Sequence, residues 1–91
     1  MNAKPPEIVV YTSPFCGYCA AAKRLLDKKG VPYTEVDVLA EPAQRTTMME
    51  RSGRRTVPQI FIGSRHIGGY DDMKALDDAG GLDPLLAGTA D

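Results

Sequence analysis

The chain has 91 residues, of which 43% are hydrophobic and 25% charged, a composition that predicts one small globular domain rather than a disordered or fibrous chain. Its 11 lysine and arginine residues nearly balance 12 aspartate and glutamate residues, so the net charge of -1 offers no general attraction to nucleic acid or anionic lipid. No apolar run approaches the roughly 20 residues of a membrane span or the roughly 7–15 residues of a signal-peptide core, so we expect no membrane segment and no export signal.

Strand and helix signals alternate along the first half of the chain. The continuous apolar run Ile8 to Tyr11 is typical of a central strand that is covered on both faces. After the break at Ser13-Pro14, alanines and leucines predict a helix that begins near Cys16 and ends at the cationic, glycine-terminated residues 28–30. Alternating polar and apolar residues over 34–38 predict a second strand, which completes a βαβ unit.

A helix and a hairpin are expected next. Pro42 stands at a first helical turn, and the helix that it opens ends at Gly53. Two short β-prone runs, residues 59–62 and 65–67, are separated by two residues, which is the spacing of a β-hairpin.

Two more helices follow in the prediction. Apolar residues at helical spacing predict a helix over 71–79, and Asp83 and Pro84 suit the N-cap and first turn of a last short helix. The order of elements predicts an α/β fold with one mixed sheet flanked by helices. We expect a single domain over residues 7–87 between two flexible tails, residues 1–6 and 88–91.

The only two cysteines, Cys16 and Cys19, stand where the central strand passes into the first helix. Free backbone N–H groups at a helix N-terminus favour the thiolate form of Cys16. The three-residue offset lets Cys19 reach Cys16, so Cys16 is expected to be the nucleophile and Cys19 the resolving cysteine. The alternatives are a permanent structural disulfide and a zinc site, although His66 is the only histidine available as a further ligand.

Three motifs give the chain a family resemblance. They are Tyr-Thr-Ser-Pro-Phe-Cys-Gly-Tyr-Cys at residues 11–19, Thr-Val-Pro at residues 56–58 and Gly-Gly-Tyr-Asp-Asp at residues 68–72. With these motifs the chain resembles a dithiol, class I glutaredoxin over residues 7–87. The resemblance implies a thioredoxin-like fold with a four-stranded mixed sheet, glutathione as cosubstrate, and reduction of protein–glutathione mixed disulfides and protein disulfides.

The resemblance also implies a glutathione site. The bond before Pro58 is cis in this family, which turns the Val57 backbone toward the active-site sulfur, where the cysteinyl part of glutathione pairs with it as an added strand. Backbone N–H groups of residues 68–72 are expected to hold the γ-glutamyl carboxylate, and Asp72 the ammonium group. The implied glutathione-binding residues are Tyr18, Arg45, Thr56, Val57, Pro58, Gly69, Tyr70, Asp71 and Asp72.

Several of these residues also have simpler interpretations. Pro58 suits the start of any strand, and Asp71 and Asp72 suit the N-terminus of any helix. Arg45 is expected to face the glycyl carboxylate of glutathione, but it also suits a solvated helix face. A further hypothesis places it in a positive rim for an anionic ligand, together with Arg51, Arg54 and Arg55.

Two positions depart from the family pattern. Ser13 replaces a lysine that many relatives carry, which removes one cation near Cys16, and Gly17 replaces the usual proline between the cysteines. Some relatives with glycine or serine there hold a [2Fe–2S] cluster between two subunits, with one cysteine from each and two glutathione thiols. The alternative function is therefore a cluster-binding dimer in iron–sulfur storage, transfer or sensing, with Cys16 as a ligand.

The remaining expectations concern partners and location. We expect a monomer unless a cluster bridges two copies, with glutathione and glutathionylated or disulfide-containing proteins as partners and ribonucleotide reductase as one candidate. The need for glutathione and the lack of structural disulfides favour a cytoplasmic protein. His66 is expected to decorate the surface of an edge strand, and its other interpretation is a catalytic pair with Cys16.

Overall fold

The computed structural model describes residues 6–88, so of the expected tails over residues 1–6 and 88–91 only residues 6 and 88 lie inside the described part. None of the helices within residues 6–88 is long and apolar enough to cross a membrane. The elements in chain order are β1 (Ile8–Thr12), α1 (Gly17–Lys29), β2 (Thr34–Asp37), α2 (Pro42–Ser52), β3 (Gln59–Ile62), β4 (Arg65–Gly68), α3 (Tyr70–Asp78) and α4 (Leu82–Leu86).

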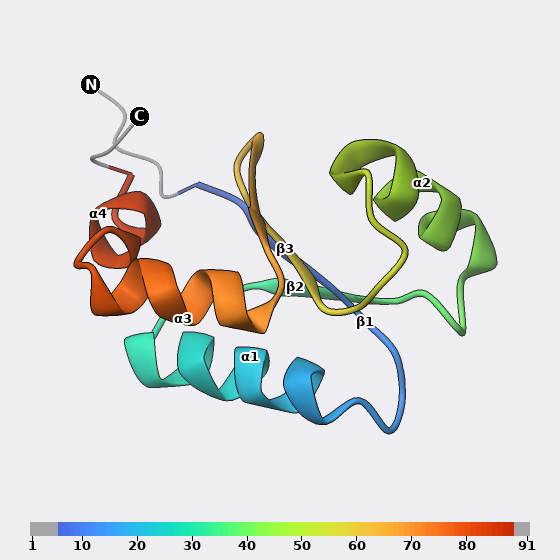
Figure 1. Cartoon of the computed structure of the whole chain (residues 1–91), viewed down its shortest axis with the longest axis horizontal. Helices are drawn as coiled ribbons and strands as arrows, with labels where there is room; N and C mark the ends of the chain where they lie inside the picture. Colours follow the sequence, from blue (N-terminus) through green and yellow to red (C-terminus); the bar gives the residue numbers. More distant parts are fainter. Residues whose placement is uncertain (1–5, 89–91) are drawn as a thin grey trace.

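The strands form one mixed sheet in the order β2-β1-β3-β4 (Figure 1). β1 pairs in parallel with β2 and antiparallel with β3, and β3 turns back into β4. The apolar run of β1 therefore lies inside the sheet, as its sequence predicts. Because β1 and β3 are antiparallel, with Tyr11 opposite Gln59, the segment that follows β1 and the segment that precedes β3 meet at one end of the sheet.

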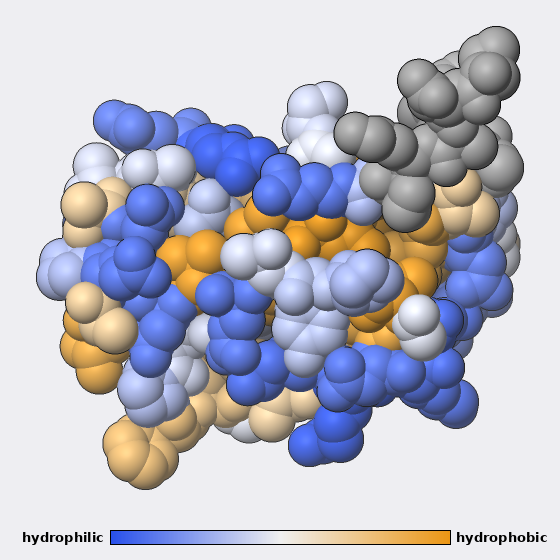
Figure 2. Space-filling model, turned by 180° about the vertical axis from the view of Figure 1, so that it is seen from behind, coloured by the Kyte–Doolittle hydropathy of each residue, from blue (hydrophilic) through white to orange (hydrophobic). Residues whose placement is uncertain are grey.

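Helices cover both faces of the sheet, with α1 and α3 lying side by side and α2 apart from them (Figure 1). Alternate strand residues point to opposite faces. Val10 packs in the larger core with Leu26 of α1 and Met73 of α3, whereas Tyr11 packs in a smaller core with Met48 of α2. Figure 2 shows apolar side chains across the middle of the rear face, bordered by hydrophilic ones.

The start and end of α1 agree with the sequence-based prediction. Cys16 is the N-cap residue with an extended backbone, and Gly30 ends the helix in the left-handed conformation at φ 73°. A glycine adopts that conformation without the steric cost that a Cβ atom brings. Helix α1 therefore presents its free N–H groups at the end of β1, where the two cysteines stand.

The predicted N-cap role of Asp83 is wrong. Helix α4 begins earlier, with Gly81 as its N-cap, and Asp83 lies in the first turn. Its carboxylate instead forms an ion pair with Lys29 Nζ at 2.9 Å, and the same ammonium group forms a second ion pair with Asp77 at 2.7 Å. The hydrogen bond to Asp77, followed by that to Asp83, raises the pKa of Lys29, and the three side chains link α1, α3 and α4.

Replacing Leu26 with alanine is expected to lower the free energy of unfolding by about 2–5 kcal/mol, because a fully buried side chain leaves a cavity in the larger core. Denaturant titration followed by circular dichroism measures the change. The control is Leu39→Ala, since Leu39 is 69% exposed and its loss should cost about 0.5 kcal/mol or less. Equal effects at the two positions would contradict the assignment of the core.

Candidate active site

The two cysteines at the start of α1 form a disulfide, with their Cα atoms 5.2 Å apart. Cys16 is half-buried, whereas Cys19 is only 2% exposed. The Cys19 backbone N–H lies 3.1 Å from Cys16 Sγ and donates to it, and the helix N-terminus adds partial positive charge at the same sulfur. Once the pair is reduced, the accessible sulfur is the one stabilised as a thiolate, and the buried sulfur has its partner within reach.

The loop before β3 lies against the cysteines, as the antiparallel pairing of β1 with β3 requires. Cys16 Sγ lies 3.9 Å from the carbonyl oxygen of Val57, and the Val57–Pro58 peptide is cis, as the family resemblance implies. A pocket of about 200 Å³ opens beside this loop, here called the Asp72 pocket. It is lined by Tyr18, Arg54, Thr56, Val57, Pro58, Gly69, Tyr70, Asp71 and Asp72.

The Asp72 pocket thus brings together every residue that the sequence assigned to glutathione except Arg45. The rings of Tyr18 and Tyr70 stack with their centroids 6.3 Å apart and form an aromatic wall from α1 and α3. Arg45 lies on α2 and donates from Nη2 to the carbonyl oxygen of Arg55 at 2.9 Å. That contact holds the chain immediately before Thr56.

Asp72 is the charged centre of this pocket. Its Oδ2 accepts hydrogen bonds from Arg54 Nη1 at 2.8 Å and from the backbone N–H of Gly69 at 2.9 Å. The Arg54 hydrogen bond, followed by that from Gly69, lowers the pKa of Asp72. The carboxylate therefore caps α3 and stays ionised inside the pocket, so the helix-cap interpretation and the binding interpretation are compatible.

The four arginines proposed as a positive rim lie in different surroundings. Arg54 lines the Asp72 pocket. Arg51 lies over the Phe61 ring, 4.0 Å from its centroid, and donates from Nη1 to the Tyr11 hydroxyl at 3.0 Å. Arg51 thus packs beside the smaller core, and Arg54 is the member of the group that reaches the pocket.

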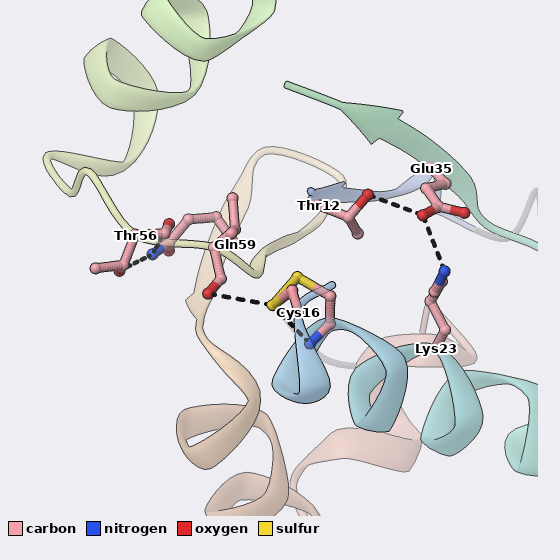
Figure 3. Close-up of a disulfide and its surroundings, with 8 residues drawn as sticks. Thr12, Cys16, Lys23, Glu35, Thr56 and Gln59 are labelled. Carbon is pink, nitrogen blue, oxygen red and sulfur yellow. Dashed lines mark hydrogen bonds and ion pairs between the residues drawn. A yellow bond between two sulfur atoms is a disulfide. The ribbon is translucent and has the colours of Figure 1, made fainter. Parts of the chain in front are cut away.

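Gln59 is a site-supporting residue that the sequence analysis missed. Its side chain is 1% exposed, and its Nε2 donates to the carbonyl oxygen of Thr56 at 3.0 Å and to the Thr56 hydroxyl at 3.2 Å (Figure 3). Its Oε1 lies 2.7 Å from His66 Nε2, which must donate because an amide oxygen only accepts. The signal available in the sequence was a lone polar residue in the otherwise apolar run 57–62.

His66 is accordingly not a surface decoration, because its side chain is half-buried. Its ring packs on Phe61 at 4.8 Å between centroids, and its Nε2 is engaged by Gln59 rather than by a cysteine. Burial, followed by the positive charge of Arg54, lowers the pKa of His66. The imidazole is therefore neutral at pH 7 and supports Gln59.

A second hollow of about 610 Å³, here called the Glu35 pocket, lies on the other side of Cys16 from Thr56 and Gln59 (Figure 3). Thr12 Oγ1 and Lys23 Nζ both donate to Glu35 Oε2, at 2.8 Å and 3.0 Å. The Lys23 hydrogen bond, followed by that from Thr12, lowers the pKa of Glu35. The lining residues are Thr12, Ser13, Pro14, Phe15, Cys16, Gly17, Cys19, Ala20, Lys23, Glu35 and Asp37.

Among residues 6–88, no three histidine, cysteine, aspartate or glutamate side chains lie close enough to hold a metal ion.

Comparison with known proteins identifies the family of this chain. The family model described as glutaredoxin matches residues 8–67. The chain is 54% identical over 80 residues to "Glutaredoxin 3" of Escherichia coli (strain K12), with 88% of this chain and 96% of that protein covered.

Solved structures agree. The fold matches a buckwheat glutaredoxin–glutathione complex with a TM-score of 0.83 and 34% identity, covering 94% of this chain and 83% of that chain. It also matches the solution structure of a glutaredoxin from Brucella melitensis with a TM-score of 0.80 and 51% identity, covering 96% of each chain.

Proposed function

The chain belongs to the glutaredoxin family, and on that premise we propose that the Asp72 pocket is its glutathione site. The fold is thioredoxin-like, as in the solved glutaredoxins. The protein is a glutathione-dependent thiol–disulfide oxidoreductase whose redox-active pair is Cys16 and Cys19.

The charges of the Asp72 pocket support a particular orientation of glutathione. The γ-glutamyl end is a zwitterion, and the pocket offers it a carboxylate, Asp72, beside a guanidinium, Arg54. The ammonium group binds Asp72, while Arg54 and the free N–H groups at the start of α3 bind the carboxylate. The cysteinyl backbone pairs with Val57, which leaves the glutathione sulfur next to Cys16 Sγ. Arg45 receives the glycyl carboxylate.

The monothiol route needs only Cys16. Its thiolate attacks the glutathionyl sulfur of a mixed disulfide, a Cys16–glutathione disulfide forms, and the protein thiolate leaves and takes a proton from water. A second glutathione thiolate then attacks the bound glutathionyl sulfur, which forms glutathione disulfide and restores the Cys16 thiolate.

The dithiol route uses both cysteines. Cys16 first attacks a protein disulfide, and one protein sulfur leaves as a thiolate. Cys19 then attacks Cys16 in the mixed disulfide, the proton of Cys19 passes to the second leaving protein thiolate, and the Cys16–Cys19 disulfide forms. The disulfide in the structure corresponds to this oxidised state, which two glutathione molecules reduce.

One observation carries the proposal. The accessible sulfur, Cys16 Sγ, lies beside a pocket in which the Asp72 carboxylate contacts the Arg54 guanidinium, while the Cys19 sulfur is buried. The test is the rate of glutathione-dependent reduction of a glutathionylated peptide, followed through NADPH consumption by glutathione reductase. We expect a rate that is proportional to protein concentration and saturates with peptide. A rate no greater than that without protein would contradict the proposal.

Replacing Gln59 with leucine is expected to raise the KM for the glutathionylated peptide about tenfold, or about 1.4 kcal/mol, because Thr56 loses two hydrogen bonds. The rate at which iodoacetamide alkylates reduced Cys16 should change less than twofold, since Gln59 acts on the pocket and not on the sulfur. The control is Gln44→Leu, a half-buried glutamine of α2 outside both pockets. An unchanged KM, or an equal loss of alkylation, would contradict this role.

The protein partners extend this proposal. Glutathionylated proteins and protein disulfides are the proposed substrates, with ribonucleotide reductase as one candidate. Dependence on glutathione supports a cytoplasmic location.

The [2Fe–2S]-bridged dimer stays a prediction. Its support is the resemblance to cluster-binding relatives that carry glycine between the two cysteines, where this chain has Gly17, exposed at the first turn of α1. Anaerobic reconstitution with iron, sulfide and glutathione tests it. A coloured dimer would support the prediction, and a colourless monomer would contradict it.

A further inference from the structure

Phe15, the residue before Cys16, combines two unfavourable features. Its side chain is fully exposed, at 107% of its reference area. Its φ of 61° lies in the left-handed region, and no other non-glycine residue within 6–88 has a positive φ. A bulky side chain disfavours that backbone conformation, and an exposed aromatic ring forgoes the gain from burial. Packing within the described chain therefore does not offset the exposure of the ring.

Phe15 lies in the turn that links β1 to α1. Backbone strain of this kind clusters at functional sites, and the surroundings of Phe15 indicate which function it serves. Phe15 borders the Glu35 pocket, which is also lined by Cys16 and Cys19. Thr56, which lines the Asp72 pocket, lies on the opposite side of Cys16 from Glu35 and Lys23 (Figure 3). If glutathione occupies the Asp72 pocket, the Glu35 pocket is the hollow beside Cys16 that the polypeptide part of a substrate can enter.

The charges that line the Glu35 pocket indicate which kind of polypeptide it would bind. Of the charged side chains that line the Glu35 pocket, Glu35 and Asp37 outnumber Lys23. Lys23 is already paired with Glu35, whose side chain keeps 40% of its surface exposed. The pocket is therefore net negative and has an apolar rim, so it complements a basic side chain next to an apolar one.

We propose that Phe15 and the Glu35 pocket form the docking surface for the polypeptide part of disulfide substrates, with a preference for apolar and basic residues beside the substrate cysteine. This inference rests on the proposed function, because it requires exchange between Cys16 and protein disulfides. Docking adds no chemical step to that exchange. Docking at Phe15 favours protein substrates, which reach Phe15, over small mixed disulfides, which do not.

The test is Phe15→Asn, because asparagine tolerates the left-handed backbone and removes the ring. Three substrates are compared by kcat/KM: a glutathionylated peptide with leucine and lysine beside the cysteine, the same peptide with two glutamates there, and the mixed disulfide of glutathione with 2-mercaptoethanol. We expect Phe15→Asn to lower kcat/KM about tenfold for the leucine–lysine peptide and less than twofold for the small disulfide. The unchanged protein should prefer the leucine–lysine peptide to the glutamate peptide about fivefold.

Two control variants complete the design. Phe15→Tyr keeps the ring and should retain the leucine–lysine preference, and Leu39→Asn removes an exposed apolar side chain that lines neither pocket. Equal losses on peptide and small disulfide, or no loss on the peptide, would overturn the docking proposal. Inactivity of the unchanged protein on the small disulfide would instead overturn the proposed function, so the two failures are distinguishable.

Discussion

Replacing Cys16 with serine is expected to abolish glutathione-dependent reduction of a glutathionylated peptide, a loss of about a thousandfold or more. Cys16 Sγ is the accessible sulfur, it receives the N–H of Cys19, and it lies beside the Val57 carbonyl at the Asp72 pocket. A serine hydroxyl in the same place is a far weaker nucleophile at neutral pH. The coupled assay with glutathione reductase measures the loss.

The matched variant is Cys19→Ser, which should keep the reduction of the glutathionylated peptide and lose the reduction of protein disulfides. Cys19 is 2% exposed, so its sulfur meets a substrate only through Cys16. Mass spectrometry of Cys19→Ser after exposure to glutathione disulfide should show one added glutathione. Loss of peptide reduction in Cys19→Ser would remove the monothiol route, and full activity of Cys16→Ser would reverse the assignment of the nucleophile.

Replacing Asp72 with asparagine is expected to raise the KM for the glutathionylated peptide about tenfold, with iodoacetamide alkylation of Cys16 unchanged. Hydrogen bonds to charged groups contribute about 1.5–3 kcal/mol, and the partial exposure of Asp72 reduces this to about 1.4 kcal/mol. Asparagine can still accept the Gly69 N–H, so helix α3 keeps its cap. Steady-state kinetics with varied peptide measure the effect.

Glutathione binding at Asp72 is expected to weaken at low pH. The contacts with Arg54 and Gly69 lower the pKa of Asp72 in the folded chain. The Asp72 carboxylate therefore stays available to the ammonium group of glutathione through the ordinary titration range of aspartate, and glutathione binding weakens only as pH falls through the lowered pKa.

The control for Asp72→Asn is Asp78→Asn, which removes the ion pair between Asp78 and Lys74 on the same helix, away from the pocket. An equal rise in KM for Asp78→Asn would contradict a specific role of Asp72.

Local signals in the sequence account for most of the fold. Continuous apolar residues identified β1 as a central strand, and the proline and glycine at either end of α2 set its limits within a residue. The predicted start of α4 was wrong, because Asp83 suits an N-cap locally but forms an ion pair with Lys29, which lies 54 residues earlier in the chain. An N-cap preference amounts to about 1 kcal/mol, which a tertiary contact can outweigh.

Some residues of the candidate site could likewise be predicted from the sequence, and others could not. The two cysteines and the residues of the Asp72 pocket other than Arg54 could be named from three motifs and from the family resemblance that these motifs carry. The contact of Gln59 with His66 could not, since it depends on the register of β3 with β4. The contacts of Arg51 could not either, since they depend on how α2 packs on the sheet. Strand register is a property of the assembled sheet.

Local sequence signals are enough to place a reactive cysteine pair at the start of a helix after a central strand, because apolar runs, prolines and glycines act on their immediate neighbours. The pairing of Arg54 with Asp72, the contact of His66 with Gln59 behind Thr56, and the second pocket beside Phe15 arise from the packed fold. Those contacts depend on how separate strands, loops and helices are placed in space, and their free energy is gained only when the sheet and helices have packed together.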